Sequence, residues 1–434
     1  MHYPDNSFIL ENVILFNQHV SILVVDGHIE LCAPKEEVAI PAEFNNLPRH
    51  DGQGALVFPS FIDAHVHLRE PGFEYKEDIQ TGLAAAAYGG FGAVFAMANT
   101  KPINDKATVT RYMIEKALQH WPHGPTLHPI GALTVGLEGK ELAPIGELAD
   151  AGCVAISNDG RPVGSTEIFR RGIEYSAQWG LKVIDHCEDP TLAPGYVMNE
   201  SHISGSIGVK GQPVVGESMQ VARDILLAEY LNMPIHLAHI SCKQSVDLIA
   251  WGKERGVPVT AETCPHYLIL DDSYLTSYNA QYKVSPPLRT KEDVEAMNEA
   301  VASGVIDILV TDHAPHAAHE KEETLDNAPC GFIGLELAVA LTYPLVKEGK
   351  LSAKAFADRW HYTPASIFSL APNNFEKGDV ADFFLFDPNK EWTASRETLH
   401  SKSINTPFLG QTMTGKVVAH WQKGMNVLQT TEEP

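Results

Sequence analysis

Two histidines separated by one residue end an apolar stretch near the start of the chain. The sequence runs Asp63-Ala64-His65-Val66-His67 after the apolar run ALVFPSFI. If this stretch is a β-strand, side chains two residues apart share one face, so the two imidazoles lie about 6–7 Å apart along the strand. Two neutral imidazoles at that spacing suit one divalent ion such as zinc. Alone, the pair is weak evidence for a metal site.

Four further ionisable residues end other apolar stretches. Asp159 follows CVAISN, His186 follows LKVID, His239 follows PIHLA and Asp312 follows IDILVT. Each one alone could be a satisfied buried polar group or a loop residue. If the ends of these strands meet at one rim, four imidazoles and two carboxylates could hold a pair of divalent metals, with open positions for a hydroxide and a substrate.

The elements that must position these residues alternate along the central part of the chain. Apolar, strand-like runs are separated by stretches of helical periodicity, among them 75–88, 166–179, 217–231, 244–255 and 291–302. The runs are ALVFPSFIDAHVH, FGAVFAMANT, LHPIGAL, CVAISND, LKVIDHC, PIHLAHIS, VPVTAETCPHY and IDILVTDHAPH. Eight β-then-α units predict an α/β fold of the (β/α)8 TIM-barrel type, whose active sites lie at the carboxyl ends of the strands. A doubly wound open sheet is the alternative, but no Gly-rich phosphate turn follows the first strand.

Both ends of the chain have a different pattern. Residues 8–58 contain short strands with a hairpin signal at Asp26-Gly27, and residues 378–428 contain similar strands. Because each end has too few strands to bury a sheet alone, we expect both ends to form one small composite β-domain. The predicted division is 1–58 and 373–434 for this domain and 59–372 for the barrel.

Composition excludes several classes of protein. Lys+Arg of 32 against Asp+Glu of 55 gives a net charge of −23, which argues against nucleic acid and anionic membrane surfaces as partners. No apolar run approaches the ~18 residues needed to span a bilayer, and the N-terminus lacks the basic region of a signal peptide. The 6 cysteines lie far apart without a CxxC pair, which favours reduced thiols and a cytoplasmic protein.

Longer motifs surround the candidate ligands. They are DAHVHLREPG at 63–72, MANTKP at 97–102, DHCED at 185–189, LAHIS at 237–241, PPLR at 286–289 and TDHAPH at 311–316. On these motifs the chain resembles the amidohydrolase superfamily and, within it, the dihydroorotases of the bacterial class I type, over essentially its whole length. The resemblance implies a barrel with a composite β-domain and a zinc enzyme that holds one or two zinc ions per chain, two being favoured.

The resemblance also implies roles for individual residues. The more buried metal would be bound by His65, His67 and Asp312, the second metal by His186 and His239, and Asp159 would bridge both. Substrate contacts would come from Arg69 and Asn99 on the carboxylate, His316 and Ser285 on the ring, and backbone amides of the GFIG stretch that begins at Gly331.

The bridging position separates branches of the superfamily. Many relatives, such as hydantoinases, dihydropyrimidinases and allantoinases, bridge their metals with a carbamylated lysine at the end of strand four. Here no lysine occurs between Lys140 and Lys182, a span that contains that strand, so Asp159 is the natural substitute. This favours the dihydroorotase branch and predicts that metal loading needs no bicarbonate.

The chain departs from the class I pattern at two positions. Asn158 stands where members usually have the first of two consecutive aspartates, and Ser285 stands where they commonly have asparagine before PPLR. The ligand position at Asp159 is kept, so metal binding is expected to survive. Ser285 puts the recognition of the pyrimidine ring in doubt, although a hydroxyl can still donate or accept.

The expected reaction is reversible hydrolysis of dihydroorotate to N-carbamoyl-L-aspartate, a step of pyrimidine biosynthesis. Metals would lower the pKa of a bound water toward ~7 and polarise the scissile carbonyl. Asp312 would take the proton of the hydroxide and return it to the ring nitrogen. Arg69 would hold the substrate carboxylate with its planar fork of donors.

Two alternatives remain open. The chain could be another cyclic amidase, against which Arg69 and the missing lysine count, or a catalytically silent scaffold for a partner enzyme, which would be expected to have lost metal ligands. A homodimer and an association with aspartate transcarbamoylase are both compatible with the sequence.

Other residues near the motifs have plainer interpretations. We expect His266 to be structural or to support a ligand, Cys187 to be a buried thiol, and Asp63 to orient the histidine pair. The polar segment 316–329 could be a mobile flap or a solvated loop.

Overall fold

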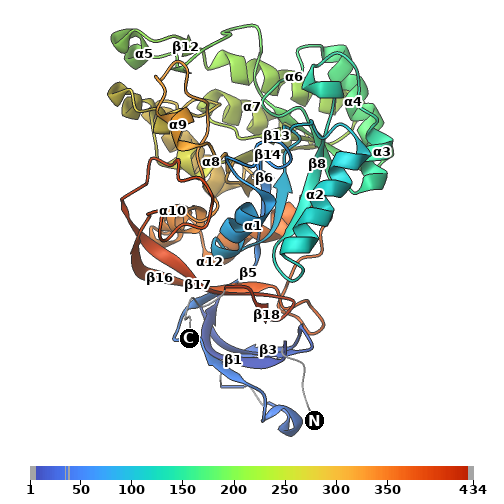
Figure 1. The fold of residues 1–434 in the computed structure, drawn as a ribbon, viewed down its shortest axis with the longest axis vertical. Helices are drawn as coiled ribbons and strands as arrows, with labels where there is room; N and C mark the ends of the chain where they lie inside the picture. The colour runs from blue at the N-terminus through green and yellow to red at the C-terminus, as the bar shows by residue number, and fades with distance from the viewer. Residues whose placement is uncertain (1–5, 35, 38–39, 429–434) are drawn as a thin grey trace.

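The computed structural model of the protein describes residues 6–34, 36–37 and 40–428. Its centre is a barrel of parallel strands (Figure 1). The strands follow one another in sequence order, and a bridge between Val66 and His313 joins the last strand to the first. They are β6 (Phe61–Val66), β7 (Phe91–Ala96), β8 (Thr126–Ala132), β9 (Ala155–Ser157), β10 (Lys182–His186), β13 (Ile235–Ala238), β14 (Val259–Thr263) and β15 (Ile308–Leu309). The predicted (β/α)8 fold is therefore confirmed, since each predicted run contains one barrel strand.

Helices surround the barrel. They are α1 (Ile79–Tyr88), α2 (Ala107–His120), α3 (Ile145–Ala151), α4 (Thr166–Gln178), α6 (Val215–Leu231), α7 (Lys243–Glu254) and α8 (Lys291–Ser303). The predicted helix 75–88 begins later, at Ile79, because the carboxylate of Asp78 accepts the N–H of Thr81 and so caps the first turn. The other four predicted helices agree with the structure to within two residues at each end.

Shorter elements lie in the loops and after the last barrel strand. The loop elements are η1 (Ala42–Phe44), η2 (Val135–Leu137), β11 (Met198–Asn199), α5 (His202–Ile207), β12 (Gly211–Gln212), η3 (Pro265–Leu268), η4 (Asp272–Ser277), η5 (Ala280–Tyr282) and α9 (Ala318–Lys321). The helices that follow are α10 (Ala338–Thr342), α11 (Pro344–Lys347), α12 (Ala353–Ala357), the π-helix η6 (Asp358–Tyr362) and α13 (Thr363–Phe368).

The two ends of the chain form one sheet below the barrel (Figure 1). Its strands are β1 (Phe8–Leu15), β2 (Gln18–Val25), β3 (His28–Pro34), β4 (Arg49–Asp51), β5 (Leu56–Pro59), β16 (Phe383–Thr393), β17 (Thr412–Gln422) and β18 (Met425–Asn426). β5 pairs antiparallel with β16, so an N-terminal strand and a C-terminal strand are neighbours. Asp26 and Gly27 make the predicted two-residue hairpin, both with positive φ. The composite β-sheet is thus as predicted, and the residue limits of the three segments stay a prediction.

Side chains of both ends share the core of this sheet. Phe8 stacks on Trp421 with ring centroids 5.5 Å apart, and Phe383 lies 5.3 Å from the same indole. Since each aromatic ring of this size buries a large apolar area, the contact holds the two ends together. This packing fixes the first barrel strand, because only Ser60 separates β5 from β6.

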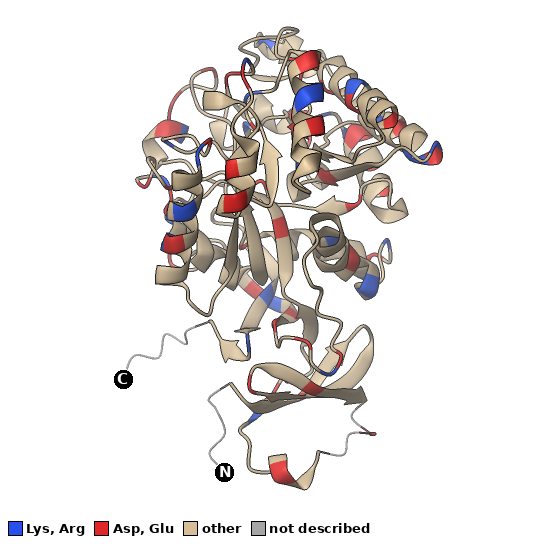
Figure 2. Cartoon of the chain, turned by 90° about the vertical axis from the view of Figure 1, so that its right-hand side faces the viewer, with Lys and Arg blue, Asp and Glu red and all other residues tan. Residues whose placement is uncertain are grey.

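The surface of the barrel carries both signs of charge. Figure 2 shows Asp and Glu interspersed with Lys and Arg along the outer helices. On α4, for example, Arg171 pairs with Glu167 and Glu174 at 2.9 Å. None of the helices in the described ranges is long and apolar enough to cross a membrane.

Candidate metal centre and active site

The site begins with the two histidines at the end of β6. Ile62 and Ala64 pack inside the barrel, whereas Phe61 and Val66 pack on its outer side against the helices. The alternation therefore changes phase between Ala64 and Val66, where the pairing with β7 shifts its register. This irregularity lets the imidazoles of His65 and His67 face the other ligand candidates at the rim, with ring centroids 5.5 Å apart.

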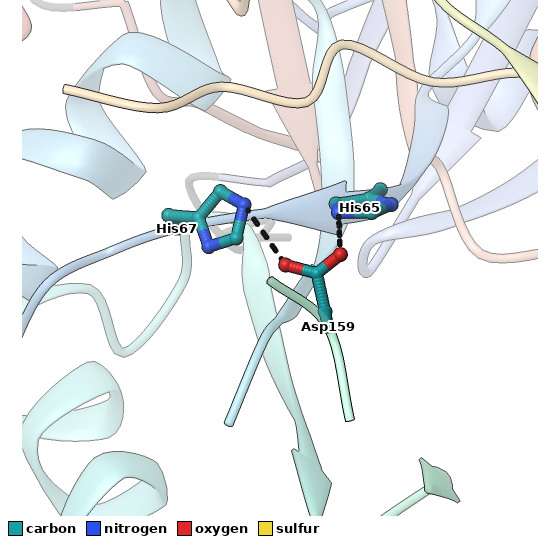
Figure 3. Close-up of side chains that lie close together, drawn as sticks. All are labelled: His65, His67 and Asp159. Atoms are coloured by element: carbon teal, nitrogen blue, oxygen red, sulfur yellow. Dashed lines mark ion pairs between the residues drawn. The ribbon is translucent and has the colours of Figure 1, made fainter. Parts of the chain in front are cut away.

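Asp159 lies between these histidines at the end of β9. Figure 3 shows one carboxylate oxygen directed to each ring: Oδ1 is 3.4 Å from Nε2 of His65, and Oδ2 is 3.5 Å from Nε2 of His67. Oδ1 also lies 3.3 Å from Nδ1 of His186 and 3.5 Å from Nε2 of His239. Asp159 is therefore shared by two groups that could each hold a metal ion, one with the first histidine pair and one with the second.

Asp312 completes the side of the site next to His67. Its Oδ1 lies 3.0 Å from Nε2 of His67 and 3.7 Å from Nε2 of His65. The other nitrogen of His67, Nδ1, is 3.0 Å from Oδ1 of Asn99. Because the amide oxygen can only accept, Nδ1 carries the proton and Nε2 turns its lone pair toward the carboxylates.

Two glutamates orient the rings of His65 and His186 in the same way. The buried carboxylate of Glu262, on β14, is 2.7 Å from Nδ1 of His65, and that of Glu188 is 3.0 Å from Nε2 of His186. Each carboxylate accepts a hydrogen bond from a ring N–H, and this contact turns the opposite ring nitrogen toward the centre of the site, where it can bind a metal. Among the described residues, the buried Nε2 of His65 finds no hydrogen-bond partner. This buried nitrogen has no hydrogen-bond partner and lies 3.4 and 3.7 Å from the carboxylates of Asp159 and Asp312, an arrangement that fits a bound cation.

The electrostatics of the cluster support this assignment. Burial opposes charge on Asp159, but the charged ring of His65 and hydrogen bonds from the surrounding histidines lower the pKa of this carboxyl well below its usual range. Burial also lowers the pKa of His186, yet its bonds to Asp159 and Glu188 outweigh burial and raise this pKa to about 10. The buried carboxylates thus favour positive charge at the site, which protonated histidines can supply. A divalent metal bound by neutral imidazoles and carboxylates supplies the same positive charge in place of these protons.

Three residues of the site hold unusual backbone conformations. Arg69, His239 and Asp312 have φ of 63°, 33° and 48°, in the left-handed region that most side chains avoid. Such conformations persist only where the surrounding structure enforces them, and they are frequent at functional sites. All three follow the end of a barrel strand, where the chain turns away from the barrel.

A cavity of about 450 Å³ opens directly above the cluster. The cavity is lined by all five residues that the sequence suggests as substrate contacts, which are Arg69, Asn99, Ser285, His316 and Gly331. It is also lined by five of the ligand candidates, which are His67, Asp159, His186, His239 and Asp312. The structure therefore brings together every residue that the sequence places in the site.

Arg69 and His316 form one wall of the cavity. Nε of Arg69 donates to the carbonyl of Pro315 at 3.0 Å, and its terminal nitrogen lies 3.3 Å from Nε2 of His316. Burial lowers the pKa of Arg69 to about 10, so the guanidinium keeps its charge at neutral pH. Burial and the charges of Arg69 and Lys76 push the pKa of His316 below its usual range, so that ring is neutral.

Gly331 contributes space to the cavity. Its N–H donates to the carbonyl of Lys283 at 2.8 Å, so this amide is already used within the chain. A Cβ at this position would lie 2.5 Å from the Cβ of Ala314 and 3.7 Å from Nε2 of His316. A side chain does not fit between these neighbours. The φ of 110° at this position also favours glycine, because other residues rarely adopt it.

The segment 316–329 is anchored by two buried lysines. Lys321 donates to the carbonyls of Pro329 and Gly331 at 2.9 and 3.0 Å. Lys283 donates to the carbonyl of Leu325 at 2.7 Å. The segment is thus tied to the rim of the cavity by buried hydrogen bonds, unlike a loop surrounded by solvent.

The residues with plainer interpretations lie outside both ligand groups. Asp63 accepts the N–H of His65 at 3.2 Å and that of Thr311 at 3.1 Å, and so joins the ends of the first and last strands. Cys187 is a buried thiol in the layer between strands and helices. His266 is buried against Phe332, and burial lowers its pKa to about 4, so its ring is neutral.

Asn158 shows how the first departure is accommodated. Its side-chain oxygen accepts from the N–H and hydroxyl of Thr134 at 3.1 and 3.0 Å, while its amide nitrogen donates to the carbonyl of Arg161 at 3.0 Å. An aspartate could not make the last bond. Asn158 thus shapes the loop that carries Asp159 and takes no place in the cluster.

Sequence reasoning missed several residues that support the site. Glu262 and Glu188 orient ligand candidates, and Tyr196 lines the cavity. Asn405, near the C-terminus, accepts the N–H of His316 at 2.9 Å and donates to Gly331 at 3.2 Å. Two of them left a signal in the sequence: Glu262 is a carboxylate within the apolar strand VTAET, and Glu188 belongs to the motif DHCED.

Comparison with solved structures identifies proteins of the same fold. An L-hydantoinase (dihydropyrimidinase) from Arthrobacter aurescens superposes with a TM-score of 0.85 at 22% identity, covering 97% of this chain and 96% of that one. A dihydropyrimidinase from Brevibacillus agri gives a TM-score of 0.79 at 21% identity, over 98% and 95%. At these identities the likeness concerns the fold.

Sequence comparison is more specific. Residues 54–245 match the family model "Dihydro-orotase-like". The chain is 45% identical over 403 residues to a dihydroorotase from Acetivibrio thermocellus, covering 92% of each chain. It is 43% identical over 412 residues to one from Citrifermentans bemidjiense, covering 95% of each. With this identity along nearly the whole chain, and with the two His/Asp groups at the rim of the barrel, the protein belongs to the dihydroorotase family.

Proposed function

We propose that the protein catalyses the reversible hydrolysis of the ring amide of dihydroorotate to N-carbamoyl-L-aspartate. The proposed cofactor is zinc, two ions per chain. One ion would be held by His65, His67 and Asp312 and the other by His186 and His239, with Asp159 between them. The sharing of Asp159 by two ligand groups supports the count of two.

One observation carries the choice of substrate. The guanidinium of Arg69 lies in the wall of the cavity above the cluster, and within the described part of the chain it forms no ion pair with a carboxylate. The charges of Asp312, Asp159 and Glu320 act on this guanidinium without a direct ion pair. Its donors therefore remain available for an anionic ligand. The carboxylate of dihydroorotate provides such an anion, and the neutral rings of hydantoin or dihydrouracil do not.

The residues of the chain would then divide the chemistry. Bound zinc would supply a more acidic water and polarise the amide carbonyl. Asp312 would accept the proton of the attacking water and return it to the departing ring nitrogen, since its carboxylate lies beside the first ligand pair. Arg69 and Asn99 would hold the substrate carboxylate, and the neutral ring of His316 would contact the pyrimidine ring.

Turnover of the zinc-loaded protein on dihydroorotate, dihydrouracil, hydantoin and allantoin tests the proposal. Dihydrouracil is dihydroorotate without its carboxylate, so the ratio of kcat/KM for these two measures carboxylate recognition directly. A preference for dihydroorotate supports the proposal. A preference for any neutral ring refutes the choice of substrate and favours another cyclic amidase.

Replacing Arg69 by alanine is expected to raise KM for dihydroorotate by roughly 10- to 100-fold, the value of a charge-assisted pair of hydrogen bonds. The preference over dihydrouracil should collapse by the same factor, while metal content stays unchanged. Arg161→Ala is a matched control, because this arginine is exposed in the loop after Asp159. Unchanged kinetics in Arg69→Ala would remove Arg69 from carboxylate binding.

The remaining predictions from the sequence concern location and partners. A cytoplasmic location, a homodimer and an association with aspartate transcarbamoylase stay predictions. A silent scaffold is disfavoured by the complete ligand set, since such a protein has no need of six ionisable ligand candidates at one rim of the barrel.

A further inference from the structure

Tyr196 stands in the cavity wall without a role in the chemistry described so far. It lies in the loop between β10 and β11, and it lines the same cavity as Asp159, His186 and Ser285. Its phenol oxygen is 3.2 Å from Oε2 of Glu188 and 2.5 Å from Oγ of Ser285. Ser285 is one of the proposed contacts of the substrate ring, so Tyr196 is hydrogen-bonded to a residue of the substrate site.

The direction of these hydrogen bonds follows from counting protons. Glu188 already accepts from Nε2 of His186 at 3.0 Å, and a carboxylate can only accept, so the phenol of Tyr196 donates to Glu188. A phenol has one proton. In the contact between Tyr196 and Ser285, the serine hydroxyl must therefore be the donor. Its proton points to the tyrosine, and its oxygen keeps two lone pairs for other partners.

We propose that Tyr196 fixes Ser285 as a hydrogen-bond acceptor for a ring N–H of the substrate, and so helps to select a cyclic ureide. This inference rests on the proposed function. Arg69 on one wall would bind the carboxylate, and Ser285 on another would accept from the ring. A carboxamide presents a donor and an acceptor together, whereas the relay from Ser285 through Tyr196 to Glu188 presents an acceptor alone. Tyr196 is thus a specificity-determining residue that acts through Ser285.

The relay predicts a specific kinetic pattern. Tyr196→Phe keeps the ring and removes the hydroxyl, so the serine proton loses its partner and the acceptor is no longer fixed. KM for dihydroorotate is expected to rise about 3- to 10-fold, the effect of one neutral hydrogen bond, with a smaller change in kcat. Ser285→Ala should raise KM at least as much. The double variant should have about the same KM as Ser285→Ala, because the tyrosine acts through the serine.

Tyr230→Phe is the matched control, since this tyrosine is 72% exposed on α6. Thermal unfolding of each variant checks that folding is preserved. A KM for Tyr196→Phe within twofold of the wild type would overturn the inference. Additive effects in the double variant would also overturn it, because the tyrosine would then act independently of Ser285. If the wild type itself does not turn over dihydroorotate, the proposed function fails, and this outcome is distinct from a turnover that is insensitive to Tyr196.

Discussion

Asp312→Asn is expected to fold, to retain at least one metal, and to lose roughly 10²- to 10⁴-fold in kcat, the usual contribution of a positioned base and acid. The amide has nearly the shape of the carboxylate but cannot accept the proton of the attacking water. Asparagine is also the right probe for the backbone, because φ of Asp312 is 48° and asparagine tolerates this left-handed conformation well. A loss of activity would therefore report on chemistry and not on strain.

Asp307→Asn is the control for this variant. Asp307 immediately precedes the same strand, β15, at its other end, where it pairs with Lys253 at 2.6 Å. Its replacement is expected to affect stability slightly and kcat hardly at all. Steady-state kinetics and the metal content of both variants make the comparison. Near wild-type turnover in Asp312→Asn would exclude Asp312 from proton transfer.

Asp159→Ala is expected to have the largest effect on metal binding of any single substitution. Asp159 belongs to both ligand groups, and its two oxygens lie 3.3–3.5 Å from nitrogens of all four histidines. Its loss removes a ligand from both positions at once and takes away a carboxylate that lies beside all four histidines. We expect both metals to be lost or greatly weakened, with kcat/KM reduced at least about 10³-fold.

His186→Ala is the comparison for this prediction. It removes one ligand of the second group and leaves the group of His65 and His67 complete. Metal content measured by mass spectrometry should therefore fall further in Asp159→Ala than in His186→Ala. Equal metal content in the two variants would contradict a shared position for Asp159.

The parts of the fold that the sequence predicted follow from short-range patterns. Barrel strands are buried on both faces, so most of them are largely apolar runs that end in a polar residue, and this rule located Asp159, His186, His239 and Asp312. The terminal sheet was predictable because Asp26-Gly27 marks a hairpin and each end lacks enough strands to bury its own core.

The parts that could not be predicted depend on contacts between distant residues. Glu262 and His65 are 197 positions apart, and Tyr196 and Ser285 are 89 apart, so no local pattern relates them. The hydrogen bond from the Gly331 N–H to the carbonyl of Lys283 could not be predicted either, because it depends on how two loops pack. The predicted start of α1 at residue 75 was wrong for a local reason. Helical periodicity extends upstream of Ile79, but Asp78 caps the helix and so sets its first residue.

The metal centre is tested most directly by the metal content of carefully purified wild-type protein, measured together with its activity before and after chelation. We expect about two divalent ions per chain, loss of turnover with chelator, and recovery on adding zinc. Bicarbonate should not be needed, because an aspartate stands where relatives would carry a carbamylated lysine. Protein that contains no bound cation and hydrolyses dihydroorotate equally well in the presence of chelator would rule out a metal-dependent reaction.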